Sequence, residues 1–215
     1  MSSHYPISLD LFQKICLVVG GGQVAERKVR SLLECGAGVK LVSPEITPGL
    51  RKLAAEGRII YRAGSYHDGD LTGVFLVIGA TDREEVNRRV ADDCAGRNLI
   101  VNIVDDPAKC SFFVPAVVRR GALTIAVSTG GKSPMLARKI REELERAYGP
   151  QYGEFLELLG QLRKKVIKNE TSEHKKMNRL EELLSEEILD LLKAGRLELV
   201  KERLQSAYRG SGREP

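Results

Sequence analysis

The chain has 215 residues, of which 42% are hydrophobic and 29% are charged, and its formal net charge is +5. This composition is that of an ordinary soluble protein, and the length suits one domain with a smaller second unit. No apolar run reaches the roughly 18 residues that a membrane span needs, and residues 1–12 lack the basic and apolar regions of a signal peptide. We therefore expect a cytoplasmic protein that does not enter a membrane.

The mild positive charge would suit either nucleic acid or a small polyanion. No helix-turn-helix, zinc-finger or RNP pattern is present, so we expect no nucleic-acid partner. The four cysteines are widely spaced and none forms a C-x-x-C pair, which indicates reduced thiols. The three histidines are isolated as well, so the sequence predicts no metal site.

Apolar runs alternate with segments of helical period in the first half of the chain. Strands are expected at residues 15–19, 39–42, 59–61, 74–78 and 99–104. Helices are expected between them; the third would begin at Asp82, with Glu85 completing a capping box. Near-continuous apolar strands that alternate with helices indicate an α/β fold, in which a parallel sheet is covered on both faces.

The alternation stops after the fifth strand. Residues 112–118 and 122–128 are β-like runs around a turn predicted at 119–121, which would form a hairpin or an extended crossover. Ser133 is predicted to cap a helix that ends near residue 149. Further helices are expected from residue 152, with a polar break over 169–176 and disorder over 209–215.

The most informative stretch is ICLVVGGGQVA, residues 15–25, in which a strand enters three glycines and a helix begins at once. Gly20, Gly22 and Ala25 fit the dinucleotide fingerprint G-x-G-x-x-G/A of Rossmann-type sheets. The first glycine permits the turn, and the second has no Cβ, so a pyrophosphate can approach the backbone there. The helix dipole favours the same anion. The alternative is a plain connecting turn.

Two other strand ends offer contacts to a cofactor. Ser43, Pro44 and Glu45 follow the second strand, where an acidic group often holds the ribose hydroxyls. No arginine directly follows Ser43 to receive a 2′-phosphate, so NAD is preferred to NADP. Ala80 and Thr81 follow the fourth strand and could pass under the nicotinamide or a ribose. In the alternative interpretation these residues only end strands and form turns.

The fifth strand ends in NIVDDP, at the edge where α/β sheets bind ligands. Asp105 and Asp106 are therefore placed for proton transfer, or for use as hard oxygen ligands of a metal ion. Pro107 pushes Asp106 into an extended conformation. The alternative is a turn without chemistry.

The segment TGGKSP offers a second site for an anion. Its glycines precede a helix N-terminus and a lysine lies beside them, so backbone N–H groups, the helix dipole and a cation converge. A ligand with many carboxylates would suit this segment. The candidate substrate-binding residues are Thr129, Gly130, Gly131, Lys132, Ser133 and Arg138. The alternative is a capped helix with a solvated basic face.

Three stretches, taken in order, resemble a known family: VVGGGQVAERKVRSLLECGAGVKLVSPE, GATDREEVN and VNIVDDPAKCSFFVPAVVRRGALTIAVSTGGKSPMLARKIREELE. They are similar to the siroheme synthase dehydrogenase/ferrochelatase unit over roughly residues 5–150. The resemblance implies NAD-dependent oxidation of precorrin-2, a tetrapyrrole with several carboxylates, to sirohydrochlorin. In bifunctional members it also implies the insertion of ferrous iron.

The resemblance also implies roles for single residues and for whole segments. Gln23 and Val24 would lie at the pyrophosphate turn, and Asp105 matches the family's catalytic aspartate. Members form homodimers through the segment after the fifth strand. We therefore expect a Rossmann domain over 1–112, a dimerisation segment over 113–149 and a helical C-terminal domain over 150–215. The residues alone leave open a non-catalytic dinucleotide-sensing module and a methyltransferase that uses S-adenosylmethionine.

Overall fold

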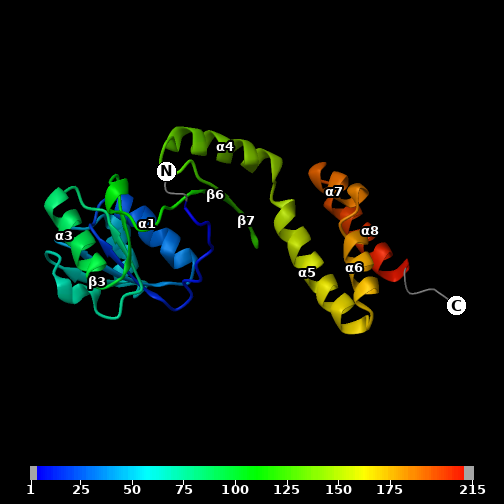
Figure 1. The fold of residues 1–215 in the computed structure, drawn as a ribbon, viewed down its shortest axis with the longest axis horizontal. Coiled ribbons are helices and arrows are strands. Elements are labelled where there is room, and N and C mark those ends of the chain that lie inside the picture. Colours follow the sequence, from blue (N-terminus) through cyan, green and yellow to red (C-terminus); the bar gives the residue numbers. More distant parts are fainter. Residues whose placement is uncertain (1–3, 211–215) are drawn as a thin grey trace. The chain divides into compact units, whose positions relative to one another are not determined.

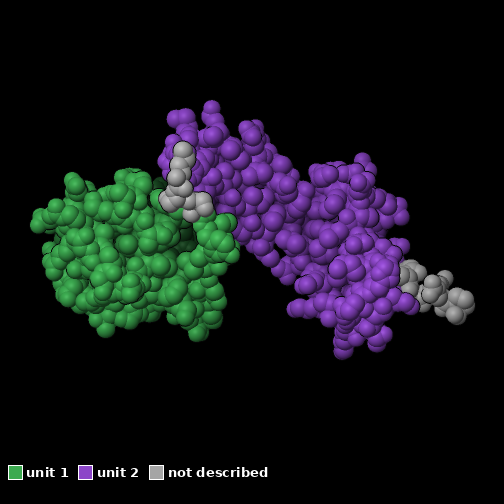
Figure 2. Space-filling model, viewed as in Figure 1, with its two compact units in different colours: residues 1–114 green, residues 115–215 purple. Residues whose placement is uncertain are grey.

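The computed structural model describes residues 4–210. The chain divides into two compact units, residues 1–114 and 115–215, which are described separately below (Figures 1 and 2). Each unit has a hydrophobic core of its own. Within residues 4–210, no helix is long and apolar enough to cross a membrane.

The first unit is built on a sheet of five parallel strands in the order β3-β2-β1-β4-β5. The strands are β1 Ile15–Val19, β2 Gly38–Ser43, β3 Ile60–Ala63, β4 Leu76–Gly79 and β5 Ile100–Ile103. The predicted Rossmann-type parallel sheet is confirmed. Since β2 and β4 lie on opposite sides of β1, the strand order reverses there, and ligands bind at the carboxyl edge of such a reversal.

Helices cover both faces of this sheet (Figure 1). The helical elements are α1 Gln23–Glu34, α2 Pro48–Ala55 and α3 Glu84–Ala95, with short 3-10 turns η1 Asp68–Leu71 and η2 Pro107–Lys109. Side chains alternate along a strand, so Cys16 and Val18 of β1 pack with α1 and α2. Leu17 and Val19 pack on the other face with α3.

Two elements of this unit begin two residues later than predicted, and the third strand ends at Ala63 and not at residue 61. Helix α3 begins at Glu84 and not at Asp82, because the Thr81 hydroxyl accepts the Arg83 N–H at 3.1 Å and forms a local turn first. The fourth strand begins at Leu76, since Val74 is held in a turn by its N–H bond to the Leu71 carbonyl at 3.2 Å.

The second unit opens with a hairpin of β6 Ala116–Arg120 and β7 Leu123–Val127, which is one of the two predicted alternatives. The predicted position of its turn was wrong. Arg119 and Arg120 pair inside the antiparallel ladder, and the turn is formed by Gly121 and Ala122. Gly121 has a φ of 57°, as tight hairpin loops require, so the strand can continue up to it.

Five helices follow the hairpin within residues 128–210. They are α4 Pro134–Ala147, α5 Gln151–Asn169, α6 Glu173–Glu182, α7 Glu186–Lys193 and α8 Leu197–Gly210. The predicted cap of α4 is confirmed, since the Ser133 hydroxyl accepts the Leu136 N–H at 3.2 Å. The predicted break over 169–176 is shorter, because α6 already begins at Glu173. Arg209 and Gly210 are helical, contrary to expectation, and 211–215 lie outside the described residues.

Candidate functional site

The glycine turn after β1 is wedged between two loops. A Cβ on Gly20 would overlap the carbonyl oxygen of Ala80 in the loop after β4. A Cβ on Gly21 would overlap the carbonyl oxygen of Glu45 in the loop after β2. By contrast, a Cβ on Gly22 would meet no atom within 4 Å. The open space lies at the second fingerprint glycine, at the N-terminus of α1, so the turn fits a pyrophosphate.

Hydrogen bonds fasten the loop after β2 to this turn. The Thr47 N–H donates to the Gly21 carbonyl at 3.0 Å, and the Thr47 hydroxyl accepts the Leu50 N–H at 3.2 Å. The same hydroxyl donates to Glu26 of α1, which also pairs with Arg30 at 2.6 Å. These bonds, first that from Thr47 and then that from Arg30, lower the pKa of Glu26. Thr47 therefore links the glycine turn, α1 and α2.

A pocket opens where β1, β2 and β4 end. Of the predicted cofactor residues, Gly20, Ser43, Pro44 and Thr81 line it. Ala80 lies directly behind Gly20. The structure thus brings these five residues together, as expected for a cofactor site between the two loops.

The other predicted cofactor residues lie outside the pocket wall. Gly22, Gln23 and Val24 form the start of α1, where the pyrophosphate is expected. Glu45 is exposed and does not line the pocket. The main-chain carbonyl of Glu45, and not its carboxylate, lies against the glycine turn. The structure therefore does not support the predicted contact between the Glu45 carboxylate and a ribose.

Tyr66 and Arg83 are among the residues of the pocket wall that sequence reasoning missed. Tyr66 is buried and its hydroxyl donates to Asp93 at 2.9 Å. Burial, and then this bond, raise the pKa of Tyr66 far above its usual range, so it stays a neutral phenol. Arg83 is exposed at the N-terminus of α3. Its place directly after the fourth strand end, in GATDR, was the signal that could have found it.

The Asp105 loop follows β5 at the same edge of the sheet. The Val104 N–H donates to the Gly79 carbonyl at 2.9 Å, so the loop starts beside the end of β4. Asp105 is exposed and has a φ of 61°, the left-handed conformation that aspartate tolerates better than most residues. Across residues 4–210, its carboxylate has no hydrogen bond or ion pair.

Asp106 differs from Asp105 because its carboxylate is already occupied. It forms a short ion pair with Lys109, and this bond lowers the pKa of Asp106. The Cys110 thiol braces the same loop, with the carbonyl oxygens of Ile103 and Asp106 each at 3.2 Å. Asp105 is therefore the carboxylate that is open to a ligand.

Lys28 of α1 adds a charge near the Asp105 loop that sequence reasoning did not single out. Burial lowers the pKa of Lys28, and repulsion from Arg27 lowers it further. Cys110 and Asp105 act in the opposite direction. Lys28 is thus a half-buried cation in the electrostatic field of the predicted catalytic carboxylate.

In the second unit, the predicted anion segment forms a compact turn before α4. The Thr129 hydroxyl accepts the Ser133 N–H and donates to the Ser133 carbonyl, each at 3.1 Å. Gly130 and Gly131 have φ values of 60° and 79°, and both are exposed, as is Lys132. The glycine backbone and the lysine are thus accessible to a ligand.

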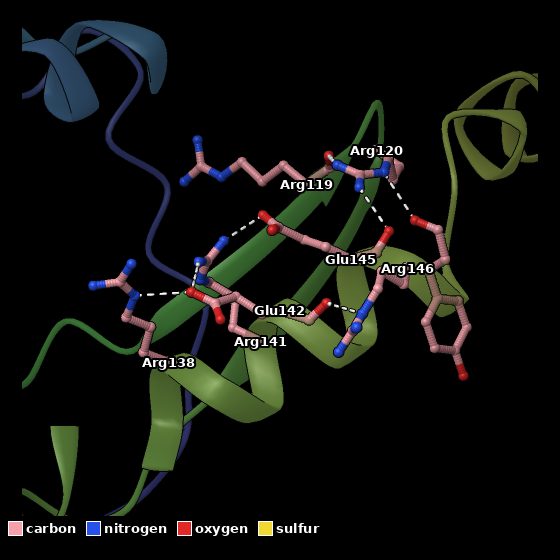
Figure 3. Close-up of polar contacts among 8 residues, drawn as sticks. Arg119, Arg120, Arg138, Arg141, Glu142, Glu145 and Arg146 are labelled. Carbon is pink, nitrogen blue, oxygen red and sulfur yellow. Dashed lines mark hydrogen bonds and ion pairs between the residues drawn. The ribbon is translucent and has the colours of Figure 1, made fainter. Parts of the chain in front are cut away.

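Several arginines on β6 and α4 are engaged in contacts within the second unit (Figure 3). Arg120 of β6 donates to the carbonyls of Tyr148 and Glu145 at 2.8 and 3.1 Å, at the C-terminus of α4. Arg138, a predicted substrate residue, pairs with Glu142 at 2.8 Å. Its side chain is 75% exposed, so the pair is solvent-screened and weak.

Across residues 4–210, no cluster of three or more histidine, cysteine or acidic side chains could hold a metal ion. The four cysteines are free thiols, of which Cys16 and Cys94 are buried. Burial first, and then the neighbouring Cys35, raise the pKa of Cys16 to about 11. Burial, followed by the charge of Asp93, raises that of Cys94 to about 11 as well.

Comparison with known proteins finds relatives of both units. Residues 7–116 match a family described as "Putative NAD(P)-binding", and residues 120–147 match "Sirohaem biosynthesis protein central". A siroheme synthase from Methylobacillus flagellatus is 39% identical over 207 residues, which are 96% of this chain and 44% of that protein. The chain belongs to the siroheme synthase N-terminal family. The resemblance inferred from the sequence motifs is confirmed, and the first unit is a nicotinamide dinucleotide-binding domain.

Other relatives have the same character. Siroheme synthase 3 from Aeromonas hydrophila is 44% identical over 163 residues, covering 76% of this chain and 35% of that protein. The chain therefore spans less than half the length of these curated relatives. The solved structure titled "SirC, precorrin-2 dehydrogenase" superposes with a TM-score of 0.79 at 27% identity, over 96% of this chain and 100% of that one. The likeness thus extends over both units.

Proposed function

We propose that this chain oxidises precorrin-2 to sirohydrochlorin with NAD as the oxidant. The observation that carries the proposal is the carboxylate of Asp105, which has no partner among the described residues and lies at the sheet edge that also holds the dinucleotide pocket. The relatives named siroheme synthase and the structure titled precorrin-2 dehydrogenase support the same reaction.

In this proposal the chain's own residues bind, orient and accept a proton. Bound NAD supplies the hydride acceptor. The glycine turn at Gly20–Gly22 holds the pyrophosphate, and Ala80 and Thr81 support the nicotinamide side. Asp105 accepts the proton that leaves the substrate when its C–H bond is cleaved, as a carboxylate base at hydrogen-bond range can do.

The choice of NAD rests on the end of β2. Ser43 is buried there, and its hydroxyl is the polar group that this strand offers to an adenosine ribose. No arginine follows it on the same loop, which reads Ser43-Pro44-Glu45.

We place the binding of the substrate and the formation of a dimer in the second unit. A tetrapyrrole with several carboxylates would contact the exposed Gly130 and Gly131 backbone and the side chains of Lys132 and Arg138. Thr129 and Ser133 shape this turn. A homodimer through the hairpin and α4 would cover Met135 and Leu136, which are 72% and 49% exposed.

Iron insertion is a second activity that the same carboxylate could serve. As ferrous iron, here a substrate, enters the ring, two protons leave the pyrrole nitrogens; Asp105 would accept one and release it to solvent before it accepts the second. An assay of sirohydrochlorin with ferrous or cobaltous ion, without NAD, tests this step separately from the oxidation.

The main proposal is tested by incubating the protein with precorrin-2 and NAD. We expect the absorption bands of sirohydrochlorin to appear together with that of NADH. If the protein binds NAD but leaves precorrin-2 unchanged, the chain is a non-catalytic dinucleotide-sensing module. Binding of S-adenosylmethionine in place of NAD would instead indicate a methyltransferase.

A further inference from the structure

Asp105 adopts an unusual backbone conformation that its own side chain does not support. Its φ of 61° lies in the left-handed region, which costs energy for a residue with a side chain and persists only where the surroundings impose it. An aspartate in this conformation can be supported by a local hydrogen bond of its carboxylate. Within residues 4–210, however, the Asp105 carboxylate has no hydrogen bond or ion pair. The neighbours of Asp105 must therefore hold the turn.

The Cys110 thiol bridges the two residues that flank this turn. Its Sγ accepts the Ile103 N–H at 3.2 Å, at the end of β5. The same sulfur lies 3.2 Å from the carbonyl oxygen of Asp106, on the other side of the turn, and 3.2 Å from that of Ile103. One sulfur atom therefore joins the end of the strand to the far side of the turn that carries Asp105.

The Cys110 thiol keeps the proton that this bridge needs. Burial is the largest influence on the group, and it raises the pKa of Cys110. A neutral thiol is both a weak acceptor and a weak donor, so its sulfur can accept the Ile103 N–H while its S–H donates to a carbonyl. A methyl group in the same place could do neither.

The residues that follow Cys110 fix its backbone against β5. The Ser111 N–H donates to the Val101 carbonyl at 2.8 Å, and the Ser111 hydroxyl accepts the Val101 N–H at 2.7 Å. The side-chain amide of Asn102, a buried residue of β5, donates to the Phe112 carbonyl at 3.0 Å. The segment after Cys110 thus runs back along the strand, and the thiol acts from a fixed base.

The ion pair between Asp106 and Lys109 does not supply the same hold. Both of its members follow Asp105 in the chain, only three positions apart, so the pair closes a local turn on the far side of the loop. The Cys110 thiol, by contrast, contacts Ile103 of β5 itself. Cys110 is therefore the side chain that ties the Asp105 turn to the sheet.

We propose that Cys110 is a positioning residue for the Asp105 carboxylate, because its thiol fixes the turn between Ile103 and Asp106 and so holds Asp105 where it accepts the substrate's proton. This inference rests on the proposed function for the reaction that Asp105 serves. Proton transfer requires the base within hydrogen-bond range, and a displacement of about 1 Å can slow a reaction about a hundredfold. Loss of the bridge should therefore lower the rate and leave binding unchanged.

Steady-state oxidation of precorrin-2 by two variants of the full chain tests the inference. Cys110→Ala removes the bridge, and we expect kcat to fall about tenfold, with KM and NAD affinity within about twofold of wild type. Cys110→Ser restores a donor and an acceptor, so kcat should return to within about threefold of wild type. An unchanged kcat in Cys110→Ala would overturn the inference, and so would a serine variant no faster than the alanine variant.

Ser111→Ala is the matched control on the neighbouring residue. It removes the hydroxyl bonds to Val101 and leaves the contacts of the Cys110 thiol in place. We expect a lower melting temperature, because buried backbone groups lose a partner, but a kcat within about twofold of wild type. If Ser111→Ala lowers kcat as much as Cys110→Ala does, the rate responds to any weakening of this segment and the inference fails.

Amide hydrogen exchange of the free protein separates this inference from the proposed function, because it needs no substrate. The Asp106 N–H donates to the Ile103 carbonyl at 3.3 Å, across the turn that carries Asp105. Its exchange should be about tenfold faster in Cys110→Ala, and near the wild-type rate in Cys110→Ser and Ser111→Ala.

The two measurements together assign any failure. If wild type leaves precorrin-2 unchanged but exchange responds as expected, the proposed function fails and the hold of Cys110 on the turn stands. If wild type oxidises precorrin-2 while neither kcat nor exchange responds to Cys110→Ala, the inference fails alone.

Discussion

Gly20 and Ala80 are packed so closely that a Cβ on Gly20 would overlap the Ala80 carbonyl oxygen. Gly20 also has a φ of 123°, which side-chain-bearing residues rarely adopt. The turn after β1 is therefore fitted to the loop after β4 without room for a side chain. Gly22 lies two residues further on and faces open space.

This contrast predicts different defects for two alanine variants. Gly20→Ala should lower the free energy of unfolding by about 2 kcal/mol or more, because it combines backbone strain with a clash against main chain. Gly22→Ala should stay within about 1 kcal/mol of wild type but weaken NAD binding about tenfold. Urea denaturation and titration with NAD measure the two effects. Normal NAD affinity of Gly22→Ala would contradict the placement of the pyrophosphate.

Thr47 should matter through its hydroxyl. Thr47→Val removes the cap of α2 and the bond to Glu26, so we expect a loss of about 1–2 kcal/mol in the free energy of unfolding. Thr47→Ser keeps the hydroxyl and should retain most of the stability. A loss of stability in Thr47→Ser with none in Thr47→Val would show that packing of the methyl group, and not the hydrogen bonds, carries the effect.

The Glu26 contacts predict a dependence of stability on pH. The pKa of Glu26 is below its ordinary value of 4.5, so its contribution is complete above that pH and is lost as the pH falls through the lowered value. Wild type should exceed Glu26→Gln in melting temperature at neutral pH, and the gap should narrow as the pH falls below 4.5 and through the lowered pKa of Glu26. A gap that stays constant over the whole acid range in which the protein remains folded would show that Glu26 does not stabilise as a carboxylate.

Arg120 and Arg138 of the second unit differ in what their side chains contact, so the effects of replacing them on stability can be compared (Figure 3). Arg120→Gln removes two hydrogen bonds to the last carbonyls of α4 and should cost about 1–2 kcal/mol. Arg138→Gln breaks only an exposed ion pair and should leave the melting temperature unchanged. Calorimetry measures the melting temperature of both variants. An equal decrease in the two would show that the change in net charge, and not the hydrogen bonds of Arg120, causes the loss of stability.

The sequence predicted the alternation of elements in the first unit well, because it depends on local periodicity. Ala25, Val29 and Leu32 share one face of α1, and all three are buried in the core against β1 and β2. The cap at Ser133 was equally readable, since a cap and the helix that it starts are neighbours in sequence.

The misses arise where a side chain competes with the backbone or where distant loops meet. The Thr81 hydroxyl captures the Arg83 N–H and delays α3, which a capping pattern alone does not reveal. Whether Glu45 or Arg83 lines the pocket depends on how the loops after β2 and β4 pack, and no local pattern encodes that.

Asp105 can be tested with little disturbance of the backbone. Its positive φ suits asparagine as well as aspartate, so Asp105→Asn changes the carboxylate and keeps the turn. Asp106→Asn is the control on the neighbouring residue, which loses only its pair with Lys109.

The most direct measurement is the rate of precorrin-2 oxidation by these two variants, with NAD affinity determined on the same samples. We predict that Asp105→Asn lowers kcat by about a hundredfold or more, as expected for loss of a general base, with NAD affinity unchanged. Asp106→Asn should retain most of the rate. Oxidation by Asp105→Asn at the wild-type rate would contradict the central role of this carboxylate.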